Sequence, residues 1–543
     1  MRIPASLSRT AQFATCAIVG WLLLACGVIP AIPAYTAKNE PLPTKFAPAA
    51  RYATQEPFVG VAISGGGSRA ASFGAAVLQE LDRLGLMDHV DVLSTVSGGG
   101  LPGAYFAIRG ESIRTEANWE EFHDAMRQSF RTKLVLRALR PDNMILQSFT
   151  HFDRSDVMAE VLDSSLFFGA TFSQTGTGQP RRPRFIPSAT WLDQSEPHWF
   201  RFTADSFGRN AESRLDNYPI AWAVMASAAF PGAFNSVTLK DYKGLVRDPR
   251  LGERYIHLID GGASDNLGVE TLLTEARIQR GKDSRSHFSC LLILVDAHPR
   301  DITASSHLIK PDNRGSILDY IIDSNYMDAF DALLVRRRES TLRDLGFGLS
   351  IFSPQRLDAD QDPAWPKRTI DRNRSIHIQD GILSRTYLPY QRVVTSPVGR
   401  GVAETNMESA SCLVWHIALS EVASLPSGEP VTPPTSTRGP TTAGPIAVYR
   451  NRLAHLTGQV KTDFNLVGPA GCDTRATQSS LREVARILVQ EDHESRQQVC
   501  EWLKTAFPRS DSLCTQPAST PSRRSLPLSI PASPGVPVSC AAP

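Results

Sequence analysis

The chain has 543 residues, and 57 Lys and Arg stand against 55 Asp and Glu, so that its formal charge is +2. A charge this close to zero gives no reason to expect a nucleic acid as a partner. The length suits about two or three average domains, or one large α/β domain with insertions and tails, and it is enough to bury a core.

The first segment is typical of a secretory leader. No charged residue lies between Arg9 and Lys38, and the apolar run AIVGWLLLACGV stands between them. A basic start followed by such a run predicts a signal peptide over residues 1–26. Within it, LLACG resembles the lipobox of bacterial lipoproteins, which makes Cys26 a candidate lipidation site at the mature N-terminus.

Two other interpretations of this leader stay open. One is a simple cleaved signal, cut near Ala34 or Ala37, and the other is an anchor that is not cleaved. All three interpretations place the body of the protein outside the cytoplasm. We therefore expect an exported protein that is a membrane-attached lipoprotein or is secreted or periplasmic. Residues 27–55 are rich in Pro and Ala, and we interpret them as a tether.

From residue 56 onward the pattern alternates between strands and helices. FVGVAIS is followed by the Gly-rich GGGSRA and a helical pattern, and VDVLSTV is followed by SGGG and a second helical pattern. The later apolar runs YIHLID and CLLILVDA are typical of buried strands. This alternation predicts an α/β core with a mainly parallel sheet over residues 56–300.

The remaining segments are assigned by composition. The basic cluster 336–338 is predicted to be a solvated helix face. Some of the eight cysteines could pair in an oxidising compartment, but their spacing gives no connectivity, and no CxxC pair or His/Cys cluster indicates a metal site. We expect a family-divergent insertion or cap over 301–423, a Pro-rich linker over 424–445, a helical part of the core over 446–507 and a disordered tail over 508–543.

The first Gly-rich turn, GGGSRA, fits the G-x-G-x-x-[GA] fingerprint of dinucleotide-binding folds. That fingerprint expects an acidic residue at the end of the next strand, where it holds a ribose hydroxyl. Here the next strand ends at Val96, and Ser97 follows it. The sequence therefore argues against a dinucleotide site.

The second Gly-rich turn carries the candidate nucleophile. Ser97 stands on a strand-to-helix turn, and Gly98 and Gly99 after it are small enough to let the helix start close to the strand. Such a nucleophile elbow projects its hydroxyl near the positive end of the following helix. Main-chain N–H groups of the GGGSRA loop can then point at the oxyanion that forms when this serine attacks a carbonyl.

Four motifs together resemble those of the patatin-like phospholipases. SGGGSRAASFG, STVSGGG, SAAFPGAF and DGGASDNLG occur in the expected order over about residues 56–300, and a weaker similarity returns at TDFNLVG. The resemblance implies a three-layer α/β/α fold with a mainly parallel central sheet. It also implies lipid acyl hydrolysis by a Ser–Asp dyad, with no metal and no cofactor.

By position in these motifs, the resemblance makes Ser97 the nucleophile and Asp260 the carboxylate that accepts or orients its proton. The other positions that it assigns support this pair. They are Gly65, Gly66 and Gly67 for the oxyanion hole, Arg69 for holding that loop, and Gly98 and Gly99 for the elbow.

One position departs from the family's pattern. The elbow usually reads G-x-S-x-G, and here Thr95 occupies the first glycine position. A β-branched side chain at that place must fit beside the following helix.

Other residues in these motifs are expected to be structural. Asp265 and Asn266 are interpreted as a turn, Ser227 as part of a helix end beside the active site, and Asp296 as a strand-end loop residue.

The preferred function is hydrolysis of an ester bond in a phospholipid or lysophospholipid through an acyl-Ser97 intermediate, and the amphiphilic substrate makes a membrane surface the expected partner. The alternative mechanism is a Ser-His-Asp triad with His257 or His298. A catalytically silent lipid-binding protein and an acyl transferase are the alternative functions.

Overall fold

The computed structural model describes the parts of the chain that form the folded body. Cys26 and residues 1–26, and most of the tether, the Pro-rich linker and the tail, lie outside the described residues. Among the helices that the structure describes, none combines the length and the apolar character needed to cross a bilayer. The described residues are 37–43, 57–175, 183–192, 198–243, 254–280, 289–299, 325–345, 373–379, 382–388, 410–423, 425, 444–460, 463–466, 473–508 and 514.

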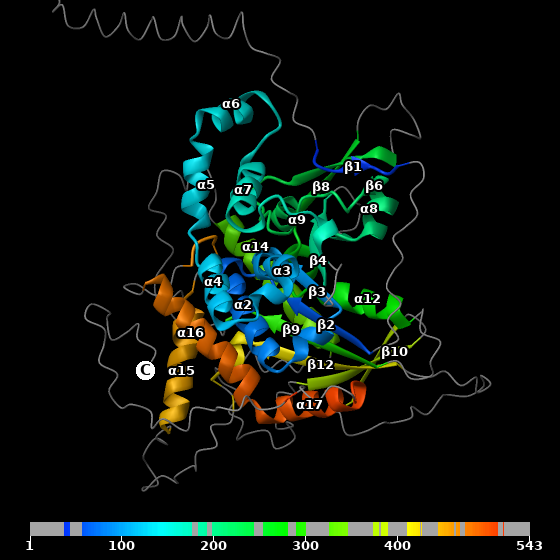
Figure 1. Cartoon of the computed structure of the whole chain (residues 1–543), viewed down its shortest axis with the longest axis vertical. Coiled ribbons are helices and arrows are strands. Elements are labelled where there is room, and N and C mark those ends of the chain that lie inside the picture. Colours follow the sequence, from blue (N-terminus) through cyan, green and yellow to red (C-terminus); the bar gives the residue numbers. More distant parts are fainter. Residues whose placement is uncertain are drawn as a thin grey trace, which may run out of the picture.

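A ten-stranded sheet runs through the molecule (Figure 1). Its middle strands are parallel, in the order β12 (Ala410–Ala418), β9 (Ser289–Asp296), β2 (Phe58–Ile63), β3 (Val92–Val96) and β4 (Arg184–Trp191). Antiparallel strands complete both ends. They are β10 (Asn373–Gln379) and β11 (Ile382–Leu388) beyond β12, and β8 (Arg254–Asp260), β7 (Val237–Asp241) and β5 (His198–Arg201) beside β4.

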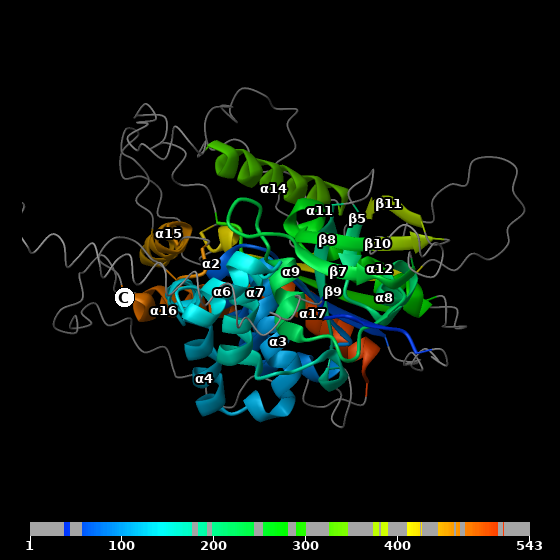
Figure 2. The same ribbon diagram turned by 90° about the horizontal axis from the view of Figure 1, so that it is seen from above.

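Helices cover both faces of this sheet, so the predicted α/β fold with a mainly parallel sheet is confirmed. Figure 2 shows α14 on one side of the sheet and α3 and α4 on the other. The side of α14 (Asn325–Asp344) also carries α12 (Val269–Arg280) and the short α11 (Gly262–Asp265). The opposite side carries α2 (Gly67–Arg83), α3 (Gly100–Arg109), α4 (Glu116–Met126), α7 (Arg154–Leu162), α9 (Ile220–Ser227), α15 (Pro445–Gly458), α16 (Thr474–Arg486) and α17 (His493–Ala506).

Three smaller elements lie at the periphery. The two-residue strands β1 (Glu40–Pro41) and β6 (Ser213–Arg214) pair with each other, and α8 (Ala204–Ala211) precedes β6. Two further helices, α5 (Phe130–Ala138) and α6 (Pro141–Phe149), follow α4 in the chain.

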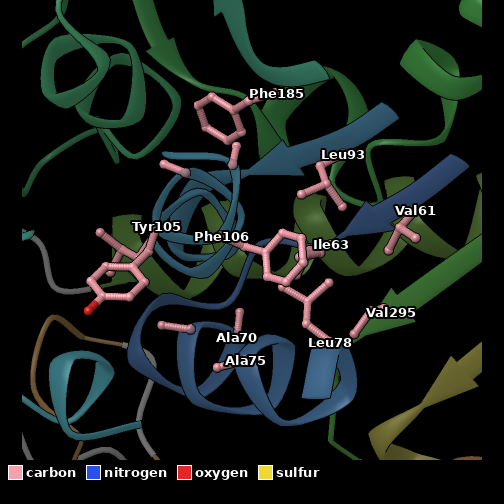
Figure 3. Close-up of a cluster of buried hydrophobic side chains, with 14 of the residues drawn as sticks. Val61, Ile63, Ala70, Ala75, Leu78, Leu93, Tyr105, Phe106, Phe185 and Val295 are labelled. Carbon is pink, nitrogen blue, oxygen red and sulfur yellow. The ribbon is translucent and has the colours of Figure 1, made fainter. Parts of the chain in front are cut away.

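The middle strands are apolar on both faces, which explains their position between two helical layers. In β2, Val61 and Ile63 pack into the larger hydrophobic cluster with α2 and α3, whereas Ala62 packs into a second cluster with α12. Figure 3 shows Ile63, Leu78 and Phe106 gathered in the larger cluster. A strand buried on both faces needs apolar residues at every position, as FVGVAI has.

The central sheet extends into the segment that we expected to be an insertion or cap. β12 lies within 301–423 and pairs in parallel with β9 from Ser411 to Ala418. Cys412 of β12 forms a disulfide with Cys290 of β9, and a second disulfide joins Cys500 and Cys514. This part of the segment is therefore a sheet strand of the core.

A buried charge cluster fastens α14 to the end of β9. Arg338 Nε donates a hydrogen bond to Asp296 Oδ2 at 2.8 Å, and the same oxygen lies 2.9 Å from His416 Nε2. Burial opposes the charge of Asp296, but Arg338 and His416 hold the pKa of this carboxyl well below its ordinary value. The prediction of a solvated face is therefore wrong for Arg338, although Arg336 is exposed, and Asp296 is a buried anchor rather than a loop residue.

Removing the guanidinium of Arg338 should destabilise the fold. Losing one partner of a buried ion pair costs about 3–5 kcal/mol, because the other charge stays buried. We expect Arg338→Met to lower the urea midpoint of unfolding clearly. Arg336→Met, on the exposed side of the same helix, is the matched control and should leave the midpoint unchanged. Equal midpoints for the two variants would contradict the role of this pair.

Candidate active site

β3 leads into α3 through a short turn that starts at Ser97. The φ of Ser97 is 51°, a left-handed conformation that is strained for a residue with a Cβ. Glycine makes the turn feasible, since a Cβ at Gly98 would overlap the carbonyl oxygen of Gly67, and a Cβ at Gly99 would lie 2.6 Å from the carbonyl oxygen of Ser64. The turn thus has the geometry of a nucleophile elbow pressed against the GGGSRA loop.

Thr95 fits beside α3 because the helix has a glycine opposite it. A Cβ at Gly103 would lie 2.5 Å from Thr95 Cγ2, closer than two carbon atoms can approach. In the family's usual elbow, a glycine at the position of Thr95 makes room for the helix. In this chain, Gly103 on the helix makes room for the Thr95 side chain.

The structure brings Ser97 and Asp260 together. Ser97 Oγ donates a hydrogen bond to Asp260 Oδ2 at 2.7 Å. Asp260 ends β8, is 2% exposed, and its Oδ1 accepts the N–H of Gly262 at 2.8 Å. Because this second oxygen is held by the main chain, the carboxylate keeps Oδ2 directed at the serine hydroxyl.

The alternative triad does not fit this geometry. In a Ser-His-Asp triad the imidazole stands between the hydroxyl and the carboxylate, and two oxygens 2.7 Å apart leave no room for a ring. His257 lies within β8. His298 follows β9, and its main-chain N–H donates to Asp296 Oδ1 at 3.0 Å. The contact is therefore a direct serine–carboxylate pair.

The GGGSRA loop offers fewer donors than the sequence predicted. The N–H of Gly65 donates to the carbonyl of Asn266 at 3.0 Å, and the N–H of Ser68 donates to that of Asp463 at 3.0 Å. Gly66 and Gly67, with φ of 136° and 53°, stand between them at the start of α2, and their N–H groups bond to no atom among the described residues. The expected oxyanion donors thus narrow from three glycines to Gly66 and Gly67, at the positive end of a helix.

Arg69 is placed where it can hold this loop, as the resemblance implied. Its side chain is buried, Nε donates to the carbonyl of Ala297 at 2.8 Å, and a terminal nitrogen donates to that of Val460 at 2.9 Å. It therefore fastens the first turn of α2 to the segment after β9 and to the end of α15.

Two side chains that the sequence indicated only as structural make direct contacts with the site. Ser227 Oγ accepts the N–H of Ser97 at 2.9 Å and donates to the carbonyl of Ser188 at 2.6 Å, which fixes the elbow to the end of α9. Asn266 fills the space beside Gly65, where a Cβ would overlap its Oδ1. The motifs SAAFPGAF and DGGASDNLG contain these residues, but the partners come from distant segments.

Asp265 is a buried carboxylate that does not contact the serine. Its Oδ2 accepts the N–H of Glu270 at 2.8 Å, while Oδ1 finds no partner among the described residues. Burial, and then the neighbouring carboxylate of Glu270, raise the pKa of Asp265 to about 6. Across the described part of the chain, no group of three His, Cys, Asp or Glu could hold a metal ion.

One stretch of chain, from β2 to α12, carries the elbow, the Gly-rich loop and the carboxylate. Residues 61–273 match the patatin-like phospholipase family. The resemblance given by the motifs is therefore confirmed over residues 61–273, a region that contains both Ser97 and Asp260. No protein of curated function matches the sequence.

Similar solved structures include three proteins at low identity. Human GIVD cytosolic phospholipase A2 is 12% identical with a TM-score of 0.42, and the match covers 83% of this chain and 60% of that one. VipD from Legionella pneumophila is 14% identical with a TM-score of 0.21, over 44% of this chain and 50% of that one. ExoU of Pseudomonas aeruginosa, in complex with SpcU, is 16% identical with a TM-score of 0.16, over 38% and 47%. The chain thus spans about 60% of the length of the phospholipase A2.

A methyl group at Gly98 should disable the site without touching either side chain of the pair. It would force the elbow away from Gly67, and a displacement of about 1 Å costs roughly 100-fold in rate. We expect Gly98→Ala to lose at least about that factor in ester hydrolysis. Gly208→Ala on α8, where a Cβ meets only Leu42 at an ordinary 3.8 Å, is the control and should keep full activity. An active Gly98→Ala variant would refute the close approach.

Asp265 should make stability fall as pH rises. Its pKa is raised in the folded state, so the folded protein binds the proton more tightly than the unfolded chain, and stability is lost between about pH 4 and pH 7. The loss is roughly 3 kcal/mol for a pKa change of this size. Asp265→Asn should remove this pH dependence. Urea unfolding at about pH 4 and pH 7 measures the free energy of unfolding of the parent and the variant. A variant with the same pH dependence as the parent would contradict this assignment.

Proposed function

We propose that this protein is a serine lipid acyl hydrolase, a phospholipase or lysophospholipase, that uses a Ser97–Asp260 dyad. The proposal is carried by the 2.7 Å contact between Ser97 Oγ and Asp260 Oδ2 at a strained elbow. The match of residues 61–273 to patatin-like phospholipases supports a lipid ester as the substrate.

In the first half of the reaction, the Asp260 carboxylate takes the proton of the Ser97 hydroxyl while Oγ bonds to the ester carbonyl carbon. The carbonyl electron pair moves onto oxygen, and this oxyanion lies toward the N–H groups of Gly66 and Gly67. The tetrahedral intermediate then breaks its bond to the alcohol, which leaves with the proton from Asp260. The product that stays on the enzyme is acyl-Ser97.

In the second half, Asp260 takes a proton from water while the water oxygen attacks the carbonyl carbon of acyl-Ser97. The bond from that carbon to Ser97 Oγ then breaks, Oγ takes the proton back from Asp260, and the fatty acid is released. An alcohol in place of water would yield a new ester, so acyl transfer is a second outcome of the same intermediate. Comparing free acid with new ester in the presence of an added alcohol measures the ratio of the two.

We infer from the leader that the protein is exported, with Cys26 as the candidate for lipid attachment to a membrane. This placement would hold the site near an amphiphilic substrate.

The dyad predicts a specific pattern of lost activity. Ser97→Ala removes the nucleophile and Asp260→Asn removes the base, so each should lower phospholipid hydrolysis by about 1000-fold or more. A fluorophosphonate should label the parent and not Ser97→Ala. His298→Ala is the control, because a histidine outside the pair should change turnover by less than about threefold.

Three results would overturn this assignment. Full activity in Ser97→Ala or Asp260→Asn excludes the dyad, and a collapse in His298→Ala supports the triad instead. A parent protein that binds lipid without hydrolysing any ester, and that takes no label, is the catalytically silent alternative.

A further inference from the structure

Six of the twelve large apolar side chains that are exposed among the described residues lie on α5, α6 and the turn between them. Leu136 is 65% exposed and Phe149 is 62% exposed. An exposed group of large apolar side chains marks an interaction site in a folded protein. The exposed apolar residues of this hairpin are Val135, Leu136, Leu139, Met144, Ile145 and Phe149.

The hairpin is held to the body along α5, where Lys133 Nζ donates to Ser165 Oγ at 2.9 Å and Arg137 Nε to Glu160 of α7 at 2.7 Å, and α6 is exposed. Phe130, at the start of α5, and Asn143 of α6 are its only buried residues within the two helices. Asn143 Nδ2 donates to the carbonyl of Arg137 at 3.1 Å, which ties α6 to α5 rather than to the body. Figure 1 shows α6 at the upper end of the molecule, with α5 running down from it beside α7, and β1 lies toward the same end.

The hairpin segment itself carries more basic than acidic residues. Residues 131–154 contain five Lys and Arg and two Asp. The side chains of Arg131 and Arg140 are more than half exposed, although Arg131 also pairs with Asp463 and Arg140 with Asp142. Large apolar side chains bordered by Arg and Lys are typical of helices that lie in a lipid–water interface, where the cations meet anionic headgroups.

The base of the hairpin and the GGGSRA loop both bind one short segment, residues 463–466. Asn465 Oδ1 accepts hydrogen bonds from Ser129 Oγ at 2.9 Å and from the N–H of Arg131 at 3.2 Å. The carbonyl of the same asparagine accepts Ser68 Oγ at 2.8 Å, one residue after Gly67. The base of the hairpin is therefore one asparagine away from the start of α2, and the apolar end lies beyond α5.

We propose that α5 and α6 form a membrane-docking hairpin that inserts its apolar tip into an anionic phospholipid surface. Asn465 ties the base of this hairpin to the Gly-rich loop, so docking would fix the candidate active site relative to the membrane surface. The benefit to catalysis rests on the proposed lipid hydrolysis, but the binding itself does not.

The test uses the full chain with Ser97→Ala, so that no lipid is consumed, and vesicles of phosphatidylcholine with or without phosphatidylglycerol. We expect sedimentation with vesicles only when phosphatidylglycerol is present. Leu136→Asp, Leu139→Asp and Phe149→Asp together should lower the bound fraction at least about tenfold, because each places a carboxylate at the lipid interface. Phe149→Asp alone should also lower the bound fraction. This single variant still tests the proposal if the triple variant does not fold.

Val448→Asp is the matched control. Val448 is 55% exposed on α15, so it tests the same substitution at an apolar residue away from the hairpin, and binding should equal that of the parent. Parental binding by both the triple and the single hairpin variants overturns the inference, as does binding that ignores phosphatidylglycerol. A parent that is dimeric in solution, ignores vesicles and becomes monomeric in the triple variant shows that a second copy covers the hairpin instead.

Hydrolysis of a short-chain, water-soluble ester separates this inference from the proposed function. With Ser97 intact, the hairpin variants should hydrolyse it at the parental rate and lose activity only on anionic vesicles. A parent inactive on every ester but bound to vesicles through the hairpin would refute the hydrolase and leave the docking surface standing.

Discussion

The pairing of Ser97 with Asp260 depends on how closely main-chain segments can approach at one edge of the sheet. The two residues are 163 positions apart, and their oxygens meet because side chains are absent around them. Gly98 lets the elbow touch the carbonyl of Gly67, and Gly261 lets β8 end against the carbonyl of Ser188. Any Cβ at these glycines would separate the segments, so glycine spacing determines where the hydroxyl and the carboxylate lie.

This dependence explains why the sequence was informative about the site. A strand followed by Ser and Gly residues has a local conformation that follows from the residues themselves, so the elbow at Ser97 could be predicted without knowledge of the rest. The same holds for the alternation of apolar runs and helical patterns that gave the fold. Thr95 shows the limit of a motif, because its tolerance depends on Gly103, which the family's pattern does not specify.

Features built from distant segments could not be predicted. The cluster 336–338 has the composition of a solvated face, and only the position of Asp296 and His416 shows that Arg338 is an internal residue. Likewise, the Gly-rich loop suggested three oxyanion donors, but the N–H of Gly65 donates to the main-chain carbonyl of Asn266 instead. In both cases the burial or bonding of one residue is decided by a partner that no local pattern identifies.

The disulfide between Cys290 and Cys412 has a consequence for proteolysis. It links β9 covalently to the neighbouring β12, and the chain between the two cysteines forms a closed covalent ring with a separation of 122 residues. A single peptide-bond cleavage anywhere inside that ring would open it without releasing either strand. The cut protein would still migrate as one species under non-reducing conditions and would separate into two fragments once a thiol is added.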